Sequence, residues 1–209
     1  MKKYVLLVAL ALICLPARGQ LIKGYGFKVG LTSSNIRVTD FPIANPLVDN
    51  RHRHTGYAAF AFIEWSGLSF LSFVTEAGYV QRGYIYDLLE DPENPLTFGF
   101  RAKIDLNYLS TATLVKMTFL ETPIAPYVLV GPRLDILVKR TPKERNTEAQ
   151  DFTSVAAGGL LGAGVEMNRL APVSLFLEIR YSFDVTNSWP GGILDVYNNA
   201  FDVLIGVKL

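Results

Sequence analysis

Residues 173–185 read VSLFLEIRYSFDV and alternate between apolar and polar side chains. Odd positions from Val173 to Phe183 are apolar, whereas the even positions include Glu178 and Arg180, and only Phe176 departs from the pattern. A period of two predicts a β-strand with one apolar and one polar face. The apolar face lines the core in a water-soluble barrel but meets lipid in an outer-membrane barrel, where the polar face fills the lumen.

Similar alternation recurs along the chain and predicts eight strands. Their expected ranges are 24–35, 55–65, 70–86, 99–116, 125–139, 153–167, 173–185 and 200–209. Proline cannot donate to a sheet ladder, so Pro132 inside the fifth strand predicts a β-bulge there. In the fourth strand, Ile104, Leu106 and Tyr108 are expected on the apolar face, opposite Lys103 and Asp105.

The connections between these strands alternate in length. Long connections follow the first, third, fifth and seventh strands, and shorter ones follow the second, fourth and sixth. An outer-membrane barrel has long external loops and short periplasmic turns, and an even number of strands leaves both ends of the sheet on the periplasmic side. We therefore predict an all-β fold, an eight-stranded antiparallel up-and-down transmembrane β-barrel. Aromatic residues near the strand ends are expected to form the interfacial girdles: Tyr57, Trp65, Tyr79, Tyr108, Tyr127, Tyr181 and Phe201.

The N-terminal segment has the features of a secretory signal peptide. Lys2 and Lys3 precede a short apolar run, and small residues come before an expected cleavage after Gly19. The expected organisation is a signal peptide at 1–19 and an outer-membrane barrel domain at 20–209. Cleavage removes three cations and the only cysteine, so the formal charge changes from +1 to about −2. That charge gives no indication of a nucleic-acid partner.

The polar faces of the predicted strands carry charges of both signs in nearly equal number. An eight-stranded barrel has little interior space beyond its own side chains, and an unpaired buried charge is costly, so we expect these charges to pair across a packed lumen. The alternative is that the lumen forms an ion-selective channel. The expected lumen residues are Lys28, Glu64, Glu76, Arg82, Arg101, Lys103, Asp105, Arg133, Asp135, Glu166, Glu178, Arg180, Asp184, Asp202 and Lys208.

The chain resembles the PorT-like outer-membrane β-barrel family of Bacteroidota-type bacteria over nearly all of the expected mature sequence. The resemblance is carried by GFKVGLTSSN at 26–35, EAGYVQRGY at 76–84, NYL at 107–109, PYVLVGPRL at 126–134, GAGVE at 162–166, LEIRYSFDV at 177–185 and the terminal VLIGVKL. Many relatives continue the fourth strand with Glu-Ile-Pro, where this chain has Ser110-Thr111-Ala112. The resemblance implies an eight-stranded barrel, an accessory role in protein secretion for the named member, and no catalytic residues.

Basic and aromatic residues outside the predicted strands are the candidates for external contacts. They are Arg51, His52, Arg53, His54, Lys139, Arg140, Lys143, Arg145 and Trp189. Solvated basic loops are expected to meet lipopolysaccharide phosphates or an envelope protein. His52 and His54, near Ser33 and Ser34, also leave open a lipid A-modifying enzyme, because nucleophilic catalysis needs a base beside a hydroxyl. The two histidines alone are weak grounds for a metal site, and no cofactor is expected.

These features favour an integral outer-membrane barrel with a non-enzymatic accessory or binding role, in protein secretion or envelope organisation, exercised through its external loops. Outer-membrane lipid, lipopolysaccharide and an envelope or secretion protein are the expected partners. Two alternatives remain open at this point, a lipid A hydrolase or acyltransferase using His52 or His54, and a small passive pore.

Overall fold

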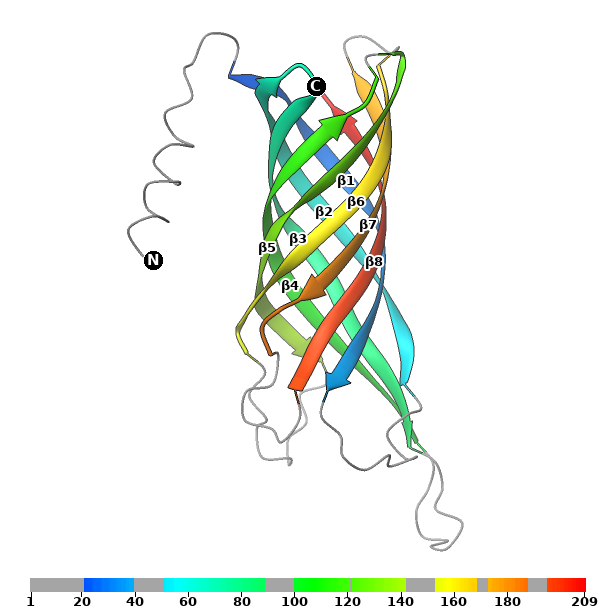
Figure 1. The fold of residues 1–209 in the computed structure, drawn as a ribbon. Helices are drawn as coiled ribbons and strands as arrows, with labels where there is room; N and C mark the ends of the chain where they lie inside the picture. Colours follow the sequence, from blue (N-terminus) through cyan, green and yellow to red (C-terminus); the bar gives the residue numbers. More distant parts are fainter. Residues whose placement is uncertain are drawn as a thin grey trace, which may run out of the picture.

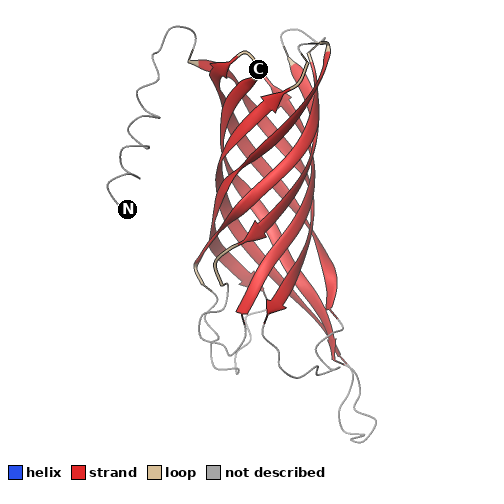
Figure 2. Cartoon of the chain, in the orientation of Figure 1, coloured by secondary structure: helices blue, strands red, loops and turns tan. Residues whose placement is uncertain are grey.

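A computed structural model describes residues 21–39, 51–88, 100–120, 122–141, 153–168, 173–187 and 195–209. These residues form eight strands and no helix (Figure 2). The strands are β1 (Ile22–Thr39), β2 (Arg51–Leu68), β3 (Leu71–Leu88), β4 (Phe100–Thr118), β5 (Ile124–Thr141), β6 (Val155–Met167), β7 (Ser174–Asp184) and β8 (Asp195–Lys208). The predicted signal peptide lies outside the described residues.

Each strand pairs antiparallel with the next, and β8 pairs with β1 to close the barrel (Figure 1). At the seam, Leu209 and Tyr25 exchange two backbone hydrogen bonds. β1 begins and β8 ends at the same rim, which is also where the β2–β3, β4–β5 and β6–β7 connections lie. The predicted topology is therefore confirmed, and the rim with the short connections is the periplasmic one by the rule for such barrels.

The outward face of the barrel carries an apolar belt, as the alternation predicts. On β1 the side chains of Tyr25, Phe27, Val29 and Leu31 are each more than half exposed, whereas Lys28 between them is buried. β7 follows the same rule, with Ile179 exposed and Arg180 buried. An exposed apolar band around a closed barrel is the surface that a lipid bilayer covers.

Several strands are longer than the alternation predicts. β1 continues four residues past its predicted end and β2 begins four residues before its predicted start. In both strands the extension carries a polar outward residue, Arg37 in β1 and Arg53 in β2, so apolar alternation stops although the backbone pairing continues. Eighteen residues at a rise of about 3.3 Å and a tilt of about 40° reach roughly 45 Å, beyond a hydrocarbon core about 30 Å thick.

The bulge predicted at Pro132 is wrong. Pro132 pairs with Gly159 without a register shift, and the β4–β5 register is the same on both sides of it, at Ala112↔Arg133 and Val115↔Val130. The β4–β5 irregularity lies nearer the outer end, between Asn107 and Tyr108.

The predicted facing of β4 is also wrong. Ile104, Leu106 and Tyr108 are buried inside the barrel, whereas the side chains of Lys103 and Asp105 are 54% and 22% exposed and lie on the other face. The physical reason is that a narrow barrel fills its interior with its own side chains, apolar ones included. The positions of Lys103 and Asp105 alone therefore did not predict which face of this strand points inward.

Apolar side chains fill the lumen in two clusters. One contains Phe62, Val74, Ala112, Leu114, Tyr127, Leu129, Leu160 and Phe176. The other contains Ala58, Phe60, Val80, Ile104, Leu106, Tyr108 and Leu204. Phe176, the exception in the alternation of β7, belongs to the first cluster and packs edge-to-face on Phe62, with ring centroids 5.5 Å apart. Tyr108 and Tyr127 are therefore interior residues and were wrongly assigned to the girdles.

Candidate functional site: the charged lumen and the outer rim

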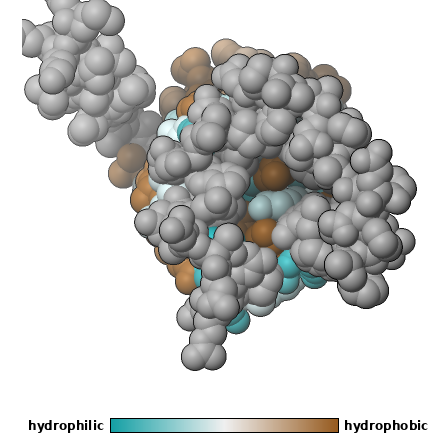
Figure 3. All heavy atoms as spheres, turned by 90° about the horizontal axis from the view of Figure 1, so that it is seen from below, coloured by the Kyte–Doolittle hydropathy of each residue, from teal (hydrophilic) through white to brown (hydrophobic). Residues whose placement is uncertain are grey.

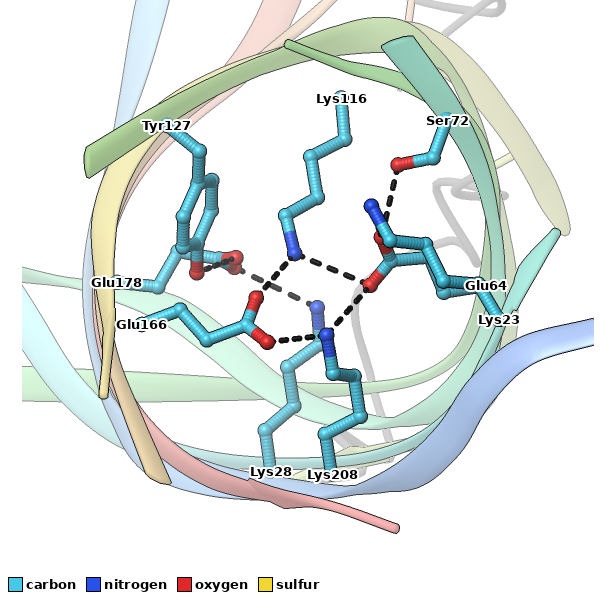
Figure 4. Close-up of polar contacts among 9 residues, drawn as sticks. All are labelled: Lys23, Lys28, Glu64, Ser72, Lys116, Tyr127, Glu166, Glu178 and Lys208. Carbon is cyan, nitrogen blue, oxygen red and sulfur yellow. Dashed lines mark hydrogen bonds and ion pairs between the residues drawn. The ribbon is translucent and has the colours of Figure 1, made fainter. Parts of the chain in front are cut away.

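The charged lumen, defined as the buried ionisable side chains inside the barrel, contains three groups along the axis. Near the periplasmic rim, Lys116 from β4 lies 2.6 Å from Glu166 and 3.1 Å from Glu64 (Figure 4). Lys208 also contacts both carboxylates, and Ser72 donates a hydrogen bond of 2.8 Å to Glu64. Two carboxylates from β2 and β6 thus share two lysines from β4 and β8.

Arg180 is the centre of the second group, midway along the barrel. Its guanidinium donates two hydrogen bonds, of 2.6 and 2.8 Å, to Glu76 on β3, and it also contacts Glu178. Lys28 lies 2.6 Å from Glu76, and Tyr127 donates a hydrogen bond of 2.8 Å to Glu178. A planar guanidinium that binds a carboxylate through two parallel hydrogen bonds is the strongest such pairing.

The third group lies toward the outer end. Arg82 on β3 is 2.5 Å from Asp135 on β5, and Arg133 is 3.0 Å from the same carboxylate. Arg133 also pairs with Asp184 on β7, which accepts hydrogen bonds from Asn198. Each of the three groups links strands that are not neighbours in the sheet, so the pairs span the lumen.

Around the first two groups the lumen has little empty space, whereas a pocket of about 580 Å³ opens at the periplasmic rim beside Glu166 and Lys208. A cavity of about 20 Å³ remains between the first two groups, lined by side chains that include Phe62, Lys116 and Glu178. That volume holds roughly one water molecule. Seen from the outer end, described polar and apolar side chains both occupy the centre of the barrel (Figure 3).

Most of the predicted lumen residues are brought together in these three groups. Lys28, Glu64, Glu76, Arg82, Arg133, Asp135, Glu166, Glu178, Arg180, Asp184 and Asp202 are all buried, and Lys208 is nearly so. Lys103 and Asp105 pair with each other on the outside, 3.3 Å apart, so their assignment to the lumen is wrong. The side chain of Arg101 lies outside the described residues.

The sequence interpretation missed Lys116, Ser72 and Tyr127. Lys116 has the same parity in β4 as Leu106 and Leu114, which were assigned to lipid or left unassigned. A charged residue of this parity is expected to face the polar interior, so Lys116 was the signal that the even residues of β4 face the lumen.

The basic cluster at 51–54 is part of β2 and does not form a solvated loop, so that prediction is wrong. His54 is 1% exposed, whereas His52 and Arg53 are exposed. Lys139 and Arg140 likewise belong to β5. Of the other contact candidates, Lys143, Arg145 and Trp189 lie outside the described residues, as does the side chain of Arg51.

A serine, a histidine and an aspartate occupy one row across four strands. Ser34 on β1 pairs with His54 on β2, and Gly83 on β3 pairs with Asp105 on β4. The Nε2 of His54 lies 2.6 Å from Asp105 Oδ1.

The geometry of this row is not that of an activated hydroxyl. Ser34 Oγ donates to the carbonyl of Gly83 at 2.9 Å and accepts from its N–H at 2.8 Å. The imidazole Nδ1 of His54 has no hydrogen-bond partner among the described residues. A nucleophile needs its hydroxyl hydrogen-bonded to the base, so here the hydroxyl instead fastens β1 to β3 where the β2–β3 register shifts.

The part of the chain that the structure describes contains no group of three metal-ligating His, Cys, Asp or Glu residues. The same residues contain no helix long and apolar enough to cross a membrane.

A closed eight-stranded barrel with an apolar belt and a charged, packed interior defines a small outer-membrane β-barrel protein. The model of the outer membrane protein beta-barrel domain family matches residues 23–189, and the chain belongs to that family. Among solved structures, Neisserial surface protein A (NspA) is similar at a TM-score of 0.52 and 12% identity, over 88% of this chain and 97% of that one. OprG from Pseudomonas aeruginosa is similar at 0.51 and 11% identity, over 91% and 96%. No curated protein sequence matches.

Proposed function

We propose that this outer-membrane protein works by binding through its outer end, with no reaction catalysed and no solute conducted. The observation that carries the proposal is the packed lumen. Apolar clusters and cross-barrel ion pairs fill the interior, and the cavity of about 20 Å³ is too small for a solute larger than water. The part of the molecule left for interaction is therefore its exterior.

The shape of the outer end supports a binding role. The β3–β4 hairpin pairs continuously from Leu71↔Met117 to Leu88↔Phe100 and extends further outward than the other strands (Figure 1). A hairpin with a continuously paired backbone is preorganised, which reduces the ordering cost of binding a partner. The resemblance to PorT-like barrels directs the proposal toward a partner in protein secretion or envelope organisation.

Co-purification from native outer membrane in mild detergent tests the binding role. We expect the full chain to capture an envelope protein, and a variant whose hairpin is shortened by joining Ile85 to Lys103 through Asn-Gly to lose it. A control that shortens residues 143–151 keeps the partner. Capture of no protein by the full chain, or equal capture by the shortened hairpin, contradicts the proposal.

The absence of catalysis has a separate test. His54→Ala and Ser34→Ala remove the base and the hydroxyl of the only row that resembles an enzyme site among the described residues. We expect lipid A from cells that express either variant to have the same mass spectrum as lipid A from cells with the unaltered protein. A change in acyl chain number that both substitutions abolish establishes a lipid A-modifying enzyme.

A further inference from the structure

The outer wall of the barrel contains a groove at the boundary between its apolar belt and its polar outer end. The groove has a volume of about 390 Å³ and is lined by Asn35 and Arg37 from β1, Arg53 from β2, Tyr181 from β7, and Asn199 and Phe201 from β8. Strands β1 and β8 meet at the seam of the barrel, so the groove crosses that seam.

The level of the groove is fixed by the strand register. On β1, Leu31 is the last apolar outward residue, and Ser33 is the first polar one. Leu31 pairs with Val203 and Ser33 pairs with Phe201, and the first polar outward residue of β8 is Asn199, which pairs with Asn35. The change from apolar to polar therefore falls between the levels of Leu31 and Asn35. This height is where lipid headgroups meet acyl chains.

Aromatic rings form the floor of the groove. The ring centroids of Tyr181 and Phe201 are 4.8 Å apart, and Phe183 stacks on Tyr181 at 6.1 Å. Directly below them, Ile179 and Val203 are at least half exposed on the apolar belt. A lipid whose headgroup occupies the groove therefore has a continuous apolar surface for its acyl chains.

Two arginines lie above this floor. The guanidinium of Arg53 is 5.3 Å from the centroid of Phe201, and that of Arg37 is 5.8 Å from the centroid of Tyr197. Both side chains are exposed, and no carboxylate of the described residues lies within ion-pair distance of either. Ring stacking positions the guanidiniums, and their planar N–H groups match the oxygens of a phosphate.

We propose that this groove binds the phosphorylated headgroup of lipid A, the membrane anchor of lipopolysaccharide. Arg37 and Arg53 hold a phosphate between them, Asn35 and Asn199 supply polar contacts to the sugar, and the acyl chains run along Tyr181, Phe201 and Val203. The phosphate pairs with two cations for which the described side chains supply no carboxylate. The aromatic floor and the apolar belt below it explain why the ligand is a lipid and not a free anion.

Native mass spectrometry of the full chain released from detergent micelles tests this site. The probes are bisphosphorylated lipid A, the same lipid A without its phosphates, and phosphatidylglycerol. We expect the protein to retain bisphosphorylated lipid A and to bind the other two at least about tenfold more weakly, because only the first combines a dianionic phosphate with a sugar headgroup.

Substitutions locate the site. Arg37→Gln with Arg53→Gln is expected to lower retention of bisphosphorylated lipid A at least about tenfold, to the level of the dephosphorylated probe. Lys139→Gln is the matched control, because Lys139 is an exposed cation at the outer end of β5, across the barrel from the seam. Heat-dependent gel migration shows whether each variant has folded.

Three outcomes overturn the proposal. The first is equal retention of phosphorylated and dephosphorylated lipid A, and the second is equal retention of phosphatidylglycerol. The third is a loss in the folded Lys139→Gln variant as large as that in the double arginine variant, which identifies general attraction by surface charge.

Discussion

Arg180 illustrates how one residue determines the stability of the lumen. It is fully buried and makes most of the hydrogen bonds of Glu76 while also contacting Glu178. Removing one partner of a buried ion pair leaves the other charge without compensation, which costs about 3–5 kcal/mol. Replacing both partners by neutral groups avoids that penalty.

We therefore expect Arg180→Met to lower the free energy of unfolding by about 3–5 kcal/mol. Urea titration in lipid vesicles, followed by tryptophan fluorescence, measures the change. The double variant Glu76→Gln with Arg180→Met is expected to be more stable than Arg180→Met alone. A single variant as stable as the unaltered protein refutes the importance of this group.

Gly206 shows a second effect at the scale of one residue. It pairs with Phe176 across β7 and β8, and a Cβ added at Gly206 would lie 2.2 Å from the ring of Phe176. The space that Gly206 leaves free is therefore taken by an aromatic ring.

Gly206→Ala is accordingly expected to cost about 1–3 kcal/mol, the usual penalty for overpacking. The same urea titration measures it. Adding Phe176→Leu should recover part of the loss, because the ring is the group that clashes. If Phe176→Leu deepens the loss in the Gly206→Ala background, the clash is not the cause.

At the scale of a strand, β7 is the element that the sequence describes best. Its odd residues face lipid and its even residues face the lumen. Phe176 is the one apolar residue at an even position, and it belongs to an interior apolar cluster. β4 is the opposite case. It has apolar residues on both faces, such as Leu106 inside and Leu109 outside, so alternation does not distinguish them.

The residues of the candidate site also differ in how well the sequence predicted them. Residues on strands with clear alternation, such as Glu178 on β7, were placed correctly. Arg37 was missed as part of a site because the extension of β1 carries polar residues outward and looks like a loop in the sequence. Contacts between distant strands, such as Arg82 with Asp135, depend on barrel closure and leave no local pattern.

The facing of β7 leads to a prediction about depth. Ile179 is 55% exposed in the middle of the apolar belt, and Val185 is 63% exposed just past the outer end of the strand. We expect Ile179→Arg to destabilise the folded barrel by about 2–4 kcal/mol and Val185→Arg by about 0–1 kcal/mol. Refolding equilibria in lipid vesicles measure both, and equal costs contradict the assigned position of the bilayer.

At the scale of the whole molecule, the packed lumen predicts an electrically silent barrel. Two apolar clusters and three charged groups lie in series along the axis. Purified protein inserted in planar bilayers is expected to show no conductance steps. Insertion is verified by protease protection in parallel vesicles, and discrete, reproducible steps from verified protein establish a pore.

The contacts of Lys208 set a limit on how this wall deforms. Lys208 is on β8, at the seam with β1, yet it holds Glu64 on β2 and Glu166 on β6. Separating β8 from β1 to open the wall laterally therefore breaks the ion pairs of Lys208 as well as the backbone hydrogen bonds between the two strands. Such an opening would also leave the carboxylates of Glu64 and Glu166 without one of their lysines, so lateral opening of the wall at this seam is disfavoured.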